Sequence, residues 1–271
     1  MSHSQESSQI FTRKIFPIKS VEQLVGSYLV AEILAEIRDE YSRELETSAA
    51  EQVPELDGEF DPAISDLYYE AASIIKFKPL LVYSLKYALE DMNKYNFKDN
   101  PSVIVAANND TSHLQKSWGM SYKDLAKTNL FDHTINVFRE ALSIAKKKGR
   151  PASMSISIVG ALLHDFGKSE LIRAELLGSA GSKGYKAHAE VSATYVSEIL
   201  SVKLYNQFHE LPAETIETLS DLVKKHHPAN QNDKRDTYIS FIIEADHAAR
   251  KLELREIMKA KALKEKKGEF F

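Results

Sequence analysis

The feature that most constrains this sequence is a segment that is apolar on nearly all sides and ends in a histidine and an aspartate. The segment spans residues 154–166, and a helix that is hydrophobic all round is buried at the centre of a protein. His164 and Asp165 therefore enter the interior, where an ionised aspartate is costly unless it is paired or binds a cation. Gly167 is predicted to stop the helix, and Lys168 follows it.

Other histidines and acids lie where predicted helices turn toward the core. In residues 131–148, 214–227 and 238–258 the apolar side chains recur at helical spacing, and one potential metal ligand continues each apolar stripe. In chain order these ligands are His133, His226 and Asp246. An unpaired aspartate on a buried face would be strongly destabilising, so a shared role for these residues is expected.

Two further histidines complete the set. His188 begins a predicted helix after a loop of small residues, 178–184, which matches no phosphate-binding fingerprint and is interpreted as a flexible approach to the site. His227 lies a hundred degrees around the helix from His226, and Pro228 is predicted to end that helix. A hydrogen-bonded core role explains any one of these histidines, but it becomes weaker when it must hold independently for every residue of the set.

Composition supports a helical protein whose metal ligands are nitrogen and oxygen. The 271 residues include only 10 glycines and 8 prolines, which favours long regular elements, and 43% are hydrophobic, enough for a sizeable core. There is no cysteine, which excludes disulfides and thiolate sites and leaves imidazole and carboxylate as ligands. The fold class predicted from these patterns is all-α.

The first half of the chain carries helical patterns without an assignable motif. A long amphipathic helix is predicted over residues 20–45. A second helix begins with Asp61 as N-cap and Pro62 in the first helical position, and Pro79 breaks or kinks it. Residues 93–121 lose the periodicity and are predicted to be irregular, with a short strand as one interpretation of the apolar run within them.

Taken together, the ligand pattern resembles the HD-domain superfamily of metal-dependent phosphohydrolases over about residues 125–255. The superfamily's core pattern, His…His-Asp…Asp, is matched by His133, His164, Asp165 and Asp246. The resemblance implies a helical bundle with a metal at its centre. It also implies that His188 and His226 are the ligands that distinguish dinuclear members, in which Asp165 is the bridging carboxylate.

The similarity is greatest to the HD-GYP branch of the superfamily. Its His-Asp-x-Gly-Lys motif is matched by residues 164–168, and its histidine pair by His226 and His227. However, no Gly-Tyr-Pro motif follows His227, and Asn129 stands where some members carry an acidic ligand for a third metal. The resemblance therefore implies the dinuclear site but not specificity for a cyclic dinucleotide.

The function predicted from this resemblance is hydrolysis of a phosphomonoester or phosphodiester, in a nucleotide-type or other phosphorylated small molecule, by two divalent metals. His133, His164 and Asp246 favour one metal, His188, His226 and His227 the other, and Asp165 bridges them. Iron or manganese is expected, with zinc, nickel or magnesium also compatible. Lys168 is predicted to neutralise substrate phosphate; the alternative is a lysine that only stabilises a helix C-terminus.

Two other functions compete with this prediction. A relaxase-like or nuclease HD domain would act on DNA phosphodiesters, and the basic residues 146–150 and 259–267 are local clusters that could bind nucleic acid, although the net charge of −4 argues against coating by bulk charge. A non-catalytic regulatory or scaffold HD domain is disfavoured, because such domains usually lose ligands and this chain has the full set.

The expected organisation is an accessory helical region over residues 1–120, an HD metal-binding domain over 121–258 and a basic tail over 259–271. The accessory region could shape the pocket, sense a ligand or mediate homo-oligomerisation. Residues 1–8 lack the apolar stretch of a signal peptide, and no apolar run approaches the roughly 20 residues of a membrane span. We therefore expect a cytoplasmic protein without a membrane partner.

Overall fold

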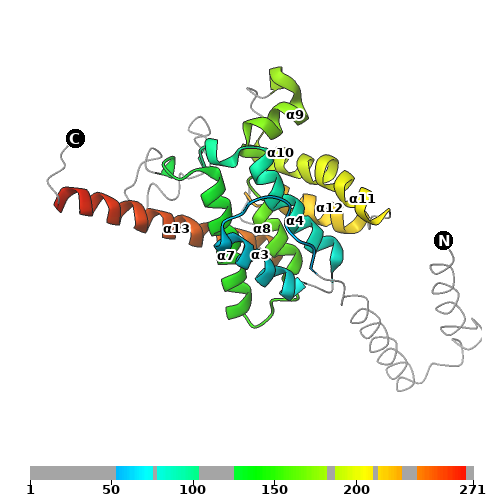
Figure 1. The fold of residues 1–271 in the computed structure, drawn as a ribbon, viewed down its shortest axis with the longest axis horizontal. Helices are drawn as coiled ribbons and strands as arrows, with labels where there is room; N and C mark the ends of the chain where they lie inside the picture. The colour runs from blue at the N-terminus through cyan, green and yellow to red at the C-terminus, as the bar shows by residue number, and fades with distance from the viewer. Residues whose placement is uncertain are drawn as a thin grey trace, which may run out of the picture. The chain divides into compact units, whose positions relative to one another are not determined.

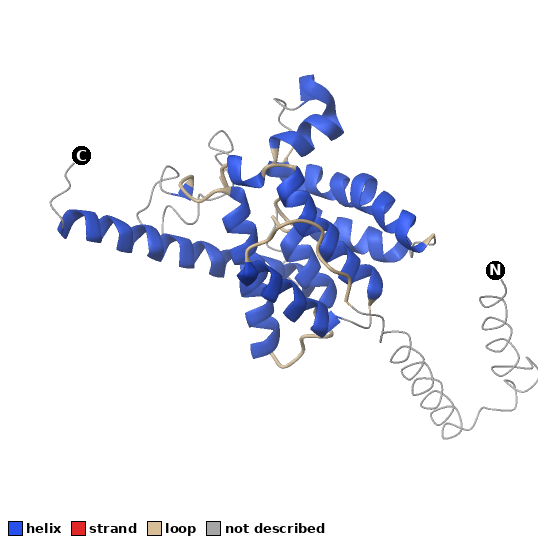
Figure 2. Cartoon of the chain, in the orientation of Figure 1, coloured by secondary structure: helices blue, strands red, loops and turns tan. Residues whose placement is uncertain are grey.

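A computed structural model describes residues 53–75, 78–103, 125–181, 187–209, 213–227 and 237–266 (Figure 1). The chain divides into two units, residues 1–52 and 53–271. The first unit, with the helix predicted over residues 20–45, lies outside the described residues. Across the described ranges all regular elements are helical and none is a strand, which confirms the predicted all-α class (Figure 2). In those ranges no helix is long and apolar enough to span a membrane.

The first two described helices begin where proline allows them to begin. Helix α3 spans Pro62–Ile75 and α4 spans Pro79–Lys94. As predicted, Asp61 caps α3: its carboxylate accepts a hydrogen bond of 2.8 Å from the backbone of Ala63. Buried side chains of both helices belong to the same core as those of the helices that carry the histidines.

Helix α8, Ser155–Leu163, is the central element. It packs against α4, α7 (Leu130–Lys147), α12 (Ala213–Lys224) and α13 (Thr237–Lys266). All of its residues except Ile156 are buried, as the apolar pattern predicted. A Cβ added to Gly160 would lie 2.9 Å from a methyl carbon of Ile242, so the glycine lets α13 approach closely.

The end of the central helix differs from the prediction. Helix α8 stops at Leu163, so His164 and Asp165 lie in a turn, which the 3₁₀ helix η3, Phe166–Lys168, follows. Gly167 is not a left-handed helix stop, because it is absent from the residues with positive φ. Its role is close approach: an added Cβ would lie 2.1 Å from the His188 carbonyl oxygen and 2.7 Å from the Ser192 nitrogen. Because Gly167 has no side chain, α10 (His188–Thr194) can pack closely enough for His188 to lie beside Asp165.

The segment after His188 is one helical run with a π-helical turn. Helix α10 spans His188–Thr194, η4 spans Tyr195–Leu200 and α11 spans Ser201–Phe208. At its centre the buried carboxylate of Asp91 on α4 accepts hydrogen bonds of 2.5 Å from the Tyr195 hydroxyl and from Lys203. A buried carboxylate with two donors ties this run to α4 and so fixes the direction in which α10 presents its first residue.

Two further boundaries differ from those predicted. Helix α12 ends at Lys224, so His226 and His227 follow the helix rather than lying on it. Helix α13 continues to Lys266, and residues 259–266 of the predicted tail are therefore helical. In Figure 1 the C-terminal part of α13 extends away from the other helices that carry ligands. The predicted domain boundary near residue 120 and the apolar run after Val103 lie outside the described residues.

Candidate metal centre

The structure brings together all seven side chains that were predicted from the sequence to be metal ligands. They form two groups, and within each group one nitrogen or oxygen atom per residue lies within 4.8 Å of the others. One group is His133, His164 and Asp246; the other is Asp165, His188, His226 and His227. The first group holds the three side chains predicted for one metal, and the second holds the three histidines predicted for the other together with Asp165.

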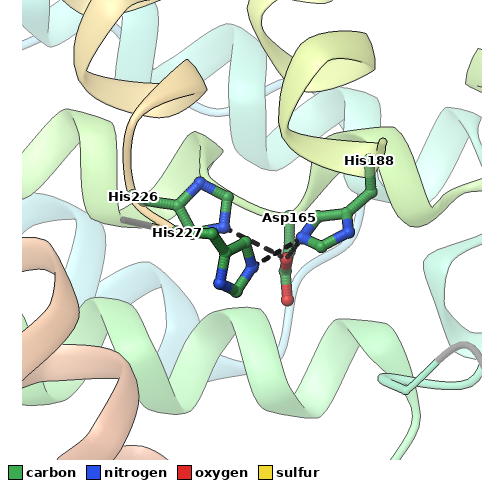
Figure 3. A group of neighbouring side chains, drawn as sticks. All are labelled: Asp165, His188, His226 and His227. Carbon is green, nitrogen blue, oxygen red and sulfur yellow. Dashed lines mark hydrogen bonds and ion pairs between the residues drawn. The ribbon is translucent and has the colours of Figure 1, made fainter. Parts of the chain in front are cut away.

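Asp165 lies between the two groups. Its Oδ2 atom is 3.2 Å from His164 Nε2 and 3.4 Å from His133 Nε2, whereas its Oδ1 atom is 3.3 Å from His188 Nε2. Figure 3 shows the carboxylate directed at the rings of His188 and His226, and His226 Nε2 is 3.8 Å from Oδ1. One carboxylate thus offers an oxygen to each group, as a bridging ligand must.

Five of the atoms that face this centre are buried and make no hydrogen bond with the described part of the chain. They are His133 Nε2, His164 Nε2, Asp165 Oδ1, His226 Nε2 and Asp246 Oδ1. Buried polar atoms are almost always hydrogen-bonded, so a convergent set of unsatisfied ones needs an explanation. Imidazole nitrogens and carboxylate oxygens in this arrangement fit a divalent cation.

The second ring nitrogen of three histidines has a partner that sets the direction of the ring. His164 Nδ1 contacts the Ala161 carbonyl at 2.8 Å, and His226 Nδ1 contacts the Val223 carbonyl at 2.5 Å. His133 Nδ1 instead contacts a carboxylate, Glu253 Oε1, at 2.8 Å. Each Nδ1 therefore acts as the donor, and Nε2, the other ring nitrogen, is turned toward the centre.

His188 and His227 form a close pair. Their Nε2 atoms are 2.8 Å apart, and His227 is the half-buried member of its group, while the other three ligands are buried. At this distance either one nitrogen donates to the other or both direct lone pairs at one cation. His227 thus marks the side of the centre with some exposure to solvent.

Electrostatics give the two aspartates and two of the histidines the protonation states that metal ligands need. Burial alone would raise the pKa of Asp165, but His164, Lys168 and His133 hold it well below its usual value. Burial lowers the pKa of His226 well below its usual value, and the neighbouring His227 adds to the effect. The same holds for His188, with burial first and then Lys168. Carboxylates are thus ionised and these imidazoles neutral.

Two ligands of the other group are coupled. Burial would raise the pKa of Asp246, yet its contact with His133, at 3.3 Å between Nε2 and Oδ1, holds that pKa well below its usual value. Burial and Arg250 lower the pKa of His133, but Glu253, Asp165 and Asp246 outweigh them and raise it to about 9. Without a cation, His133 therefore carries a proton at neutral pH.

The structure places Lys168 against the carboxylate of Asp165. Its Nζ atom donates to Asp165 Oδ2 at 2.7 Å and to the carbonyl oxygen of Ser102 at 3.1 Å. The side chain is buried, and the alternative of a lysine that only stabilises a helix C-terminus does not account for its contact with Asp165. A contact with substrate phosphate stays a prediction.

The sequence analysis did not identify Glu253 and Arg250, which lie behind His133. Both are buried charged residues of α13. Their spacing is a usable signal: Arg250 and Glu253 follow Asp246 by four and seven residues, which places all three on one face of a helix. Ser102 had no such signal, because it takes part through its backbone carbonyl as well as its hydroxyl.

Asn129, which stands in the place of a third-metal ligand, has a structural partner instead. Its side-chain oxygen accepts a hydrogen bond of 2.8 Å from the backbone of Asp132 and so caps α7. Its amide also donates to the Asp132 carboxylate at 2.9 Å.

Fold and site together define a helical domain with a histidine and aspartate centre suited to divalent cations. Comparison with known families agrees: residues 130–264 match the family described as HD domain, from the first residue of α7 almost to the end of α13. The chain therefore belongs to the HD superfamily of metal-dependent phosphohydrolases, and all seven candidate ligands lie within the matched region. No curated protein and no solved structure was found to match it.

Proposed function

We propose that this protein is a phosphohydrolase that uses two divalent metals to cleave a phosphomonoester or phosphodiester in a nucleotide-type substrate. The observation that carries the proposal is the position of Asp165, whose two oxygens face two separate groups of ligands. A centre for a single ion would not need a carboxylate shared in this way.

The seven candidate ligands would be shared between two cations. His133, His164 and Asp246 would hold one cation with Oδ2 of Asp165, and His188, His226 and His227 the other with Oδ1. When bound, such a pair of cations lowers the pKa of a water molecule and stabilises charge on phosphoryl oxygens. Nitrogen and oxygen donors without thiolate favour iron or manganese, and zinc, nickel or magnesium is compatible.

Lys168 has a part in keeping this centre assembled. Its ammonium group helps to keep Asp165 ionised and holds Oδ2 in place through the 2.7 Å contact. We propose that the same ammonium group also offsets negative charge that substrate phosphate brings to the site.

The surface charge favours a small substrate over a nucleic acid. Two of the basic residues at the end of α7 are paired with acids: Lys146 with Glu70 and Lys148 with Glu244, each at 2.5 Å. Pairing reduces the charge that these lysines could offer to a phosphate backbone. Because no Gly-Tyr-Pro motif follows His227, the proposal does not extend to a cyclic dinucleotide.

The test combines metal analysis with hydrolysis. The purified full chain should contain about two equivalents of transition metal or bind them when manganese is added, and it should hydrolyse bis(p-nitrophenyl) phosphate or p-nitrophenyl phosphate. His164→Ala combined with Asp165→Ala should abolish both properties. His209→Asn, an exposed histidine outside the centre, is the matched control and should change neither. A wild-type chain that binds no metal and hydrolyses neither ester would contradict the proposal.

A further inference from the structure

We infer that Glu253, held by Arg250, is a positioning residue for His133 and makes the group of His133, His164 and Asp246 the tighter of the two metal sites. This inference rests on the proposed two-metal function and adds an order of binding to it. The first cation enters the His133 group, and the second completes the group of His188, His226 and His227.

Glu253 gives the outer nitrogen of His133 a carboxylate partner, whereas the outer nitrogens of His164 and His226 face backbone carbonyls. Its Oε1 atom is 2.8 Å from His133 Nδ1 and also accepts a weaker contact of 3.4 Å from the Asn136 amide. Glutamate and histidine are both buried, at 4% and 0% exposure. A carboxylate in this position fixes the ring orientation and increases the basicity of the nitrogen that faces the metal.

Arg250 holds the glutamate from the other side. Its guanidinium donates to Glu253 Oε2 at 2.9 Å and to both the hydroxyl and the carbonyl oxygen of Ser102, each at 2.9 Å. The two oxygens of Glu253 are thus assigned to different partners, one to the histidine and one to the arginine. Pairing with a buried cation lets the carboxylate stay ionised away from water.

The contacts of Arg250 also connect His133 with Asp165 through Ser102 and Lys168. The Ser102 carbonyl oxygen that accepts from Arg250 also accepts from Lys168, and Lys168 donates to Asp165. A continuous series of buried contacts therefore leads from His133 to the bridging carboxylate. It holds two ligands of the first site in register with each other.

The second group differs at His226 and in the number of its acidic ligands. His226 directs its outer nitrogen at the neutral carbonyl of Val223, which polarises an imidazole less than a carboxylate does. The group also contains no acid other than the shared Asp165, whereas the first group adds Asp246. A divalent cation therefore meets more negative charge and a more rigid ligand in the His133 group.

The experiment is a calorimetric titration of the metal-free full chain with manganese. The wild type should show two binding steps of different affinity. Glu253→Gln should weaken the tighter step by about 10-fold to 100-fold, the usual loss for outer partners of a ligand, and change the weaker step less than about 3-fold. In activity assays it should raise the manganese concentration needed for half activation, while kcat at saturating manganese stays within a few-fold of the wild type.

Two further variants keep the result interpretable. Glu256→Gln changes an exposed glutamate that pairs with Lys259 on the same helix, and both steps should stay unchanged. Arg250→Met combined with Glu253→Gln removes both buried charges, so neither is left unpaired; it should fold and show the same weakening of the tighter step as Glu253→Gln.

The outcomes separate this inference from the proposed function. A wild-type chain that shows no binding would overturn the two-metal function and the order of binding with it. Two intact steps in Glu253→Gln, as in Glu256→Gln, would overturn the role of Glu253 and leave the function standing. Equal weakening of both steps, with a lower Tm in the presence of chelator, would show a packing role and also overturn it.

Discussion

The two ligand groups of the centre are built differently, and the difference lies in where the chain places them. His133 and Asp246 lie within the long helices α7 and α13, and His164 directly follows the buried helix α8. In the second group, His188 is the first residue of α10, and His226 and His227 come after the end of α12. The first group is therefore fixed by helix packing, and the second by how helix ends meet.

Asp165 therefore lies between a group held mainly by packed helices and a group held at helix ends. Asp165 touches both groups, so changes in either half should be transmitted through it. Substitutions can separate the two groups, and the largest effect is expected at the residue they share.

Asp165→Asn should have the largest effect. The amide keeps the shape of the side chain but removes the negative charge that both groups face, and one oxygen is replaced by a donor. We expect loss of both metal-binding steps and a fall in kcat of about a thousandfold or more, since bound metals supply several kcal/mol of transition-state stabilisation. Metal content after dialysis and the rate of diester hydrolysis measure the two effects. A variant that retained two equivalents of metal would contradict the bridging role.

A comparison of His164→Ala with His227→Ala should distinguish the halves. His164 is fully buried with its outer nitrogen on a helix carbonyl, whereas His227 is half-buried. We expect His164→Ala to remove the tighter step and lower kcat about 100-fold, and His227→Ala to weaken only the other step, about 10-fold. Metal stoichiometry at limiting manganese provides the measurement. Equal losses in both variants would remove the distinction between the groups.

Metal binding by the group of His133, His164 and Asp246 should also depend on pH. In the metal-free protein the pKa of His133 is raised to about 9, so its contribution to stability is complete below its unfolded pKa and is lost as pH rises through about 9. A cation must displace the same proton from Nε2. The apparent affinity of the tighter step should therefore rise up to about tenfold per pH unit between about pH 7 and 9.

Proton release provides the measurement for this pH effect. Titrations at pH 7.5 in two buffers with different ionisation enthalpies should show about one proton released in the tighter step. Little release is expected in the weaker one, because burial keeps His188 and His226 neutral. An affinity that does not change between pH 7 and 9 would contradict the assignment of the proton to His133.

Some of the ligands could be predicted from helical periodicity, and others only from the resemblance to a family. Helical periodicity alone directed His133 and Asp246 of the first group, and His226 of the second, to the interior, because each continues an apolar stripe. His188 and His227 have no such stripe, and their place beside Asp165 depended on the resemblance to a family. Periodicity also extended α8 and α12 past their observed ends, because it does not register a tight turn whose residues stay buried.

The partners of the ligands, such as Glu253, could not be predicted from the sequence for another reason. The pairing of Glu253 with His133 joins residues 120 positions apart, and that of Arg250 with Ser102 spans 148. Spacing along α13 shows that Glu253 shares a face with Asp246, but only the packing of α13 on α7 shows which histidine it meets. Local patterns specify faces of helices, and the partners across them come from tertiary structure.

The smallest predicted effect concerns the glycine that brings the second group to Asp165. In Gly167→Ala the added Cβ would meet backbone atoms of His188 and Ser192 at 2.1 and 2.7 Å, so α10 must shift. We expect a loss of about 1–3 kcal/mol in unfolding free energy, typical of overpacking, and a few-fold weaker second metal step with the first step unchanged. Gly160→Ala is the matched control, because its Cβ has one close contact, at 2.9 Å, and this is with the movable end of the Ile242 side chain rather than with backbone. If Gly167→Ala weakened the first step as much as the second, the second group would not depend separately on how α10 meets the turn at Asp165.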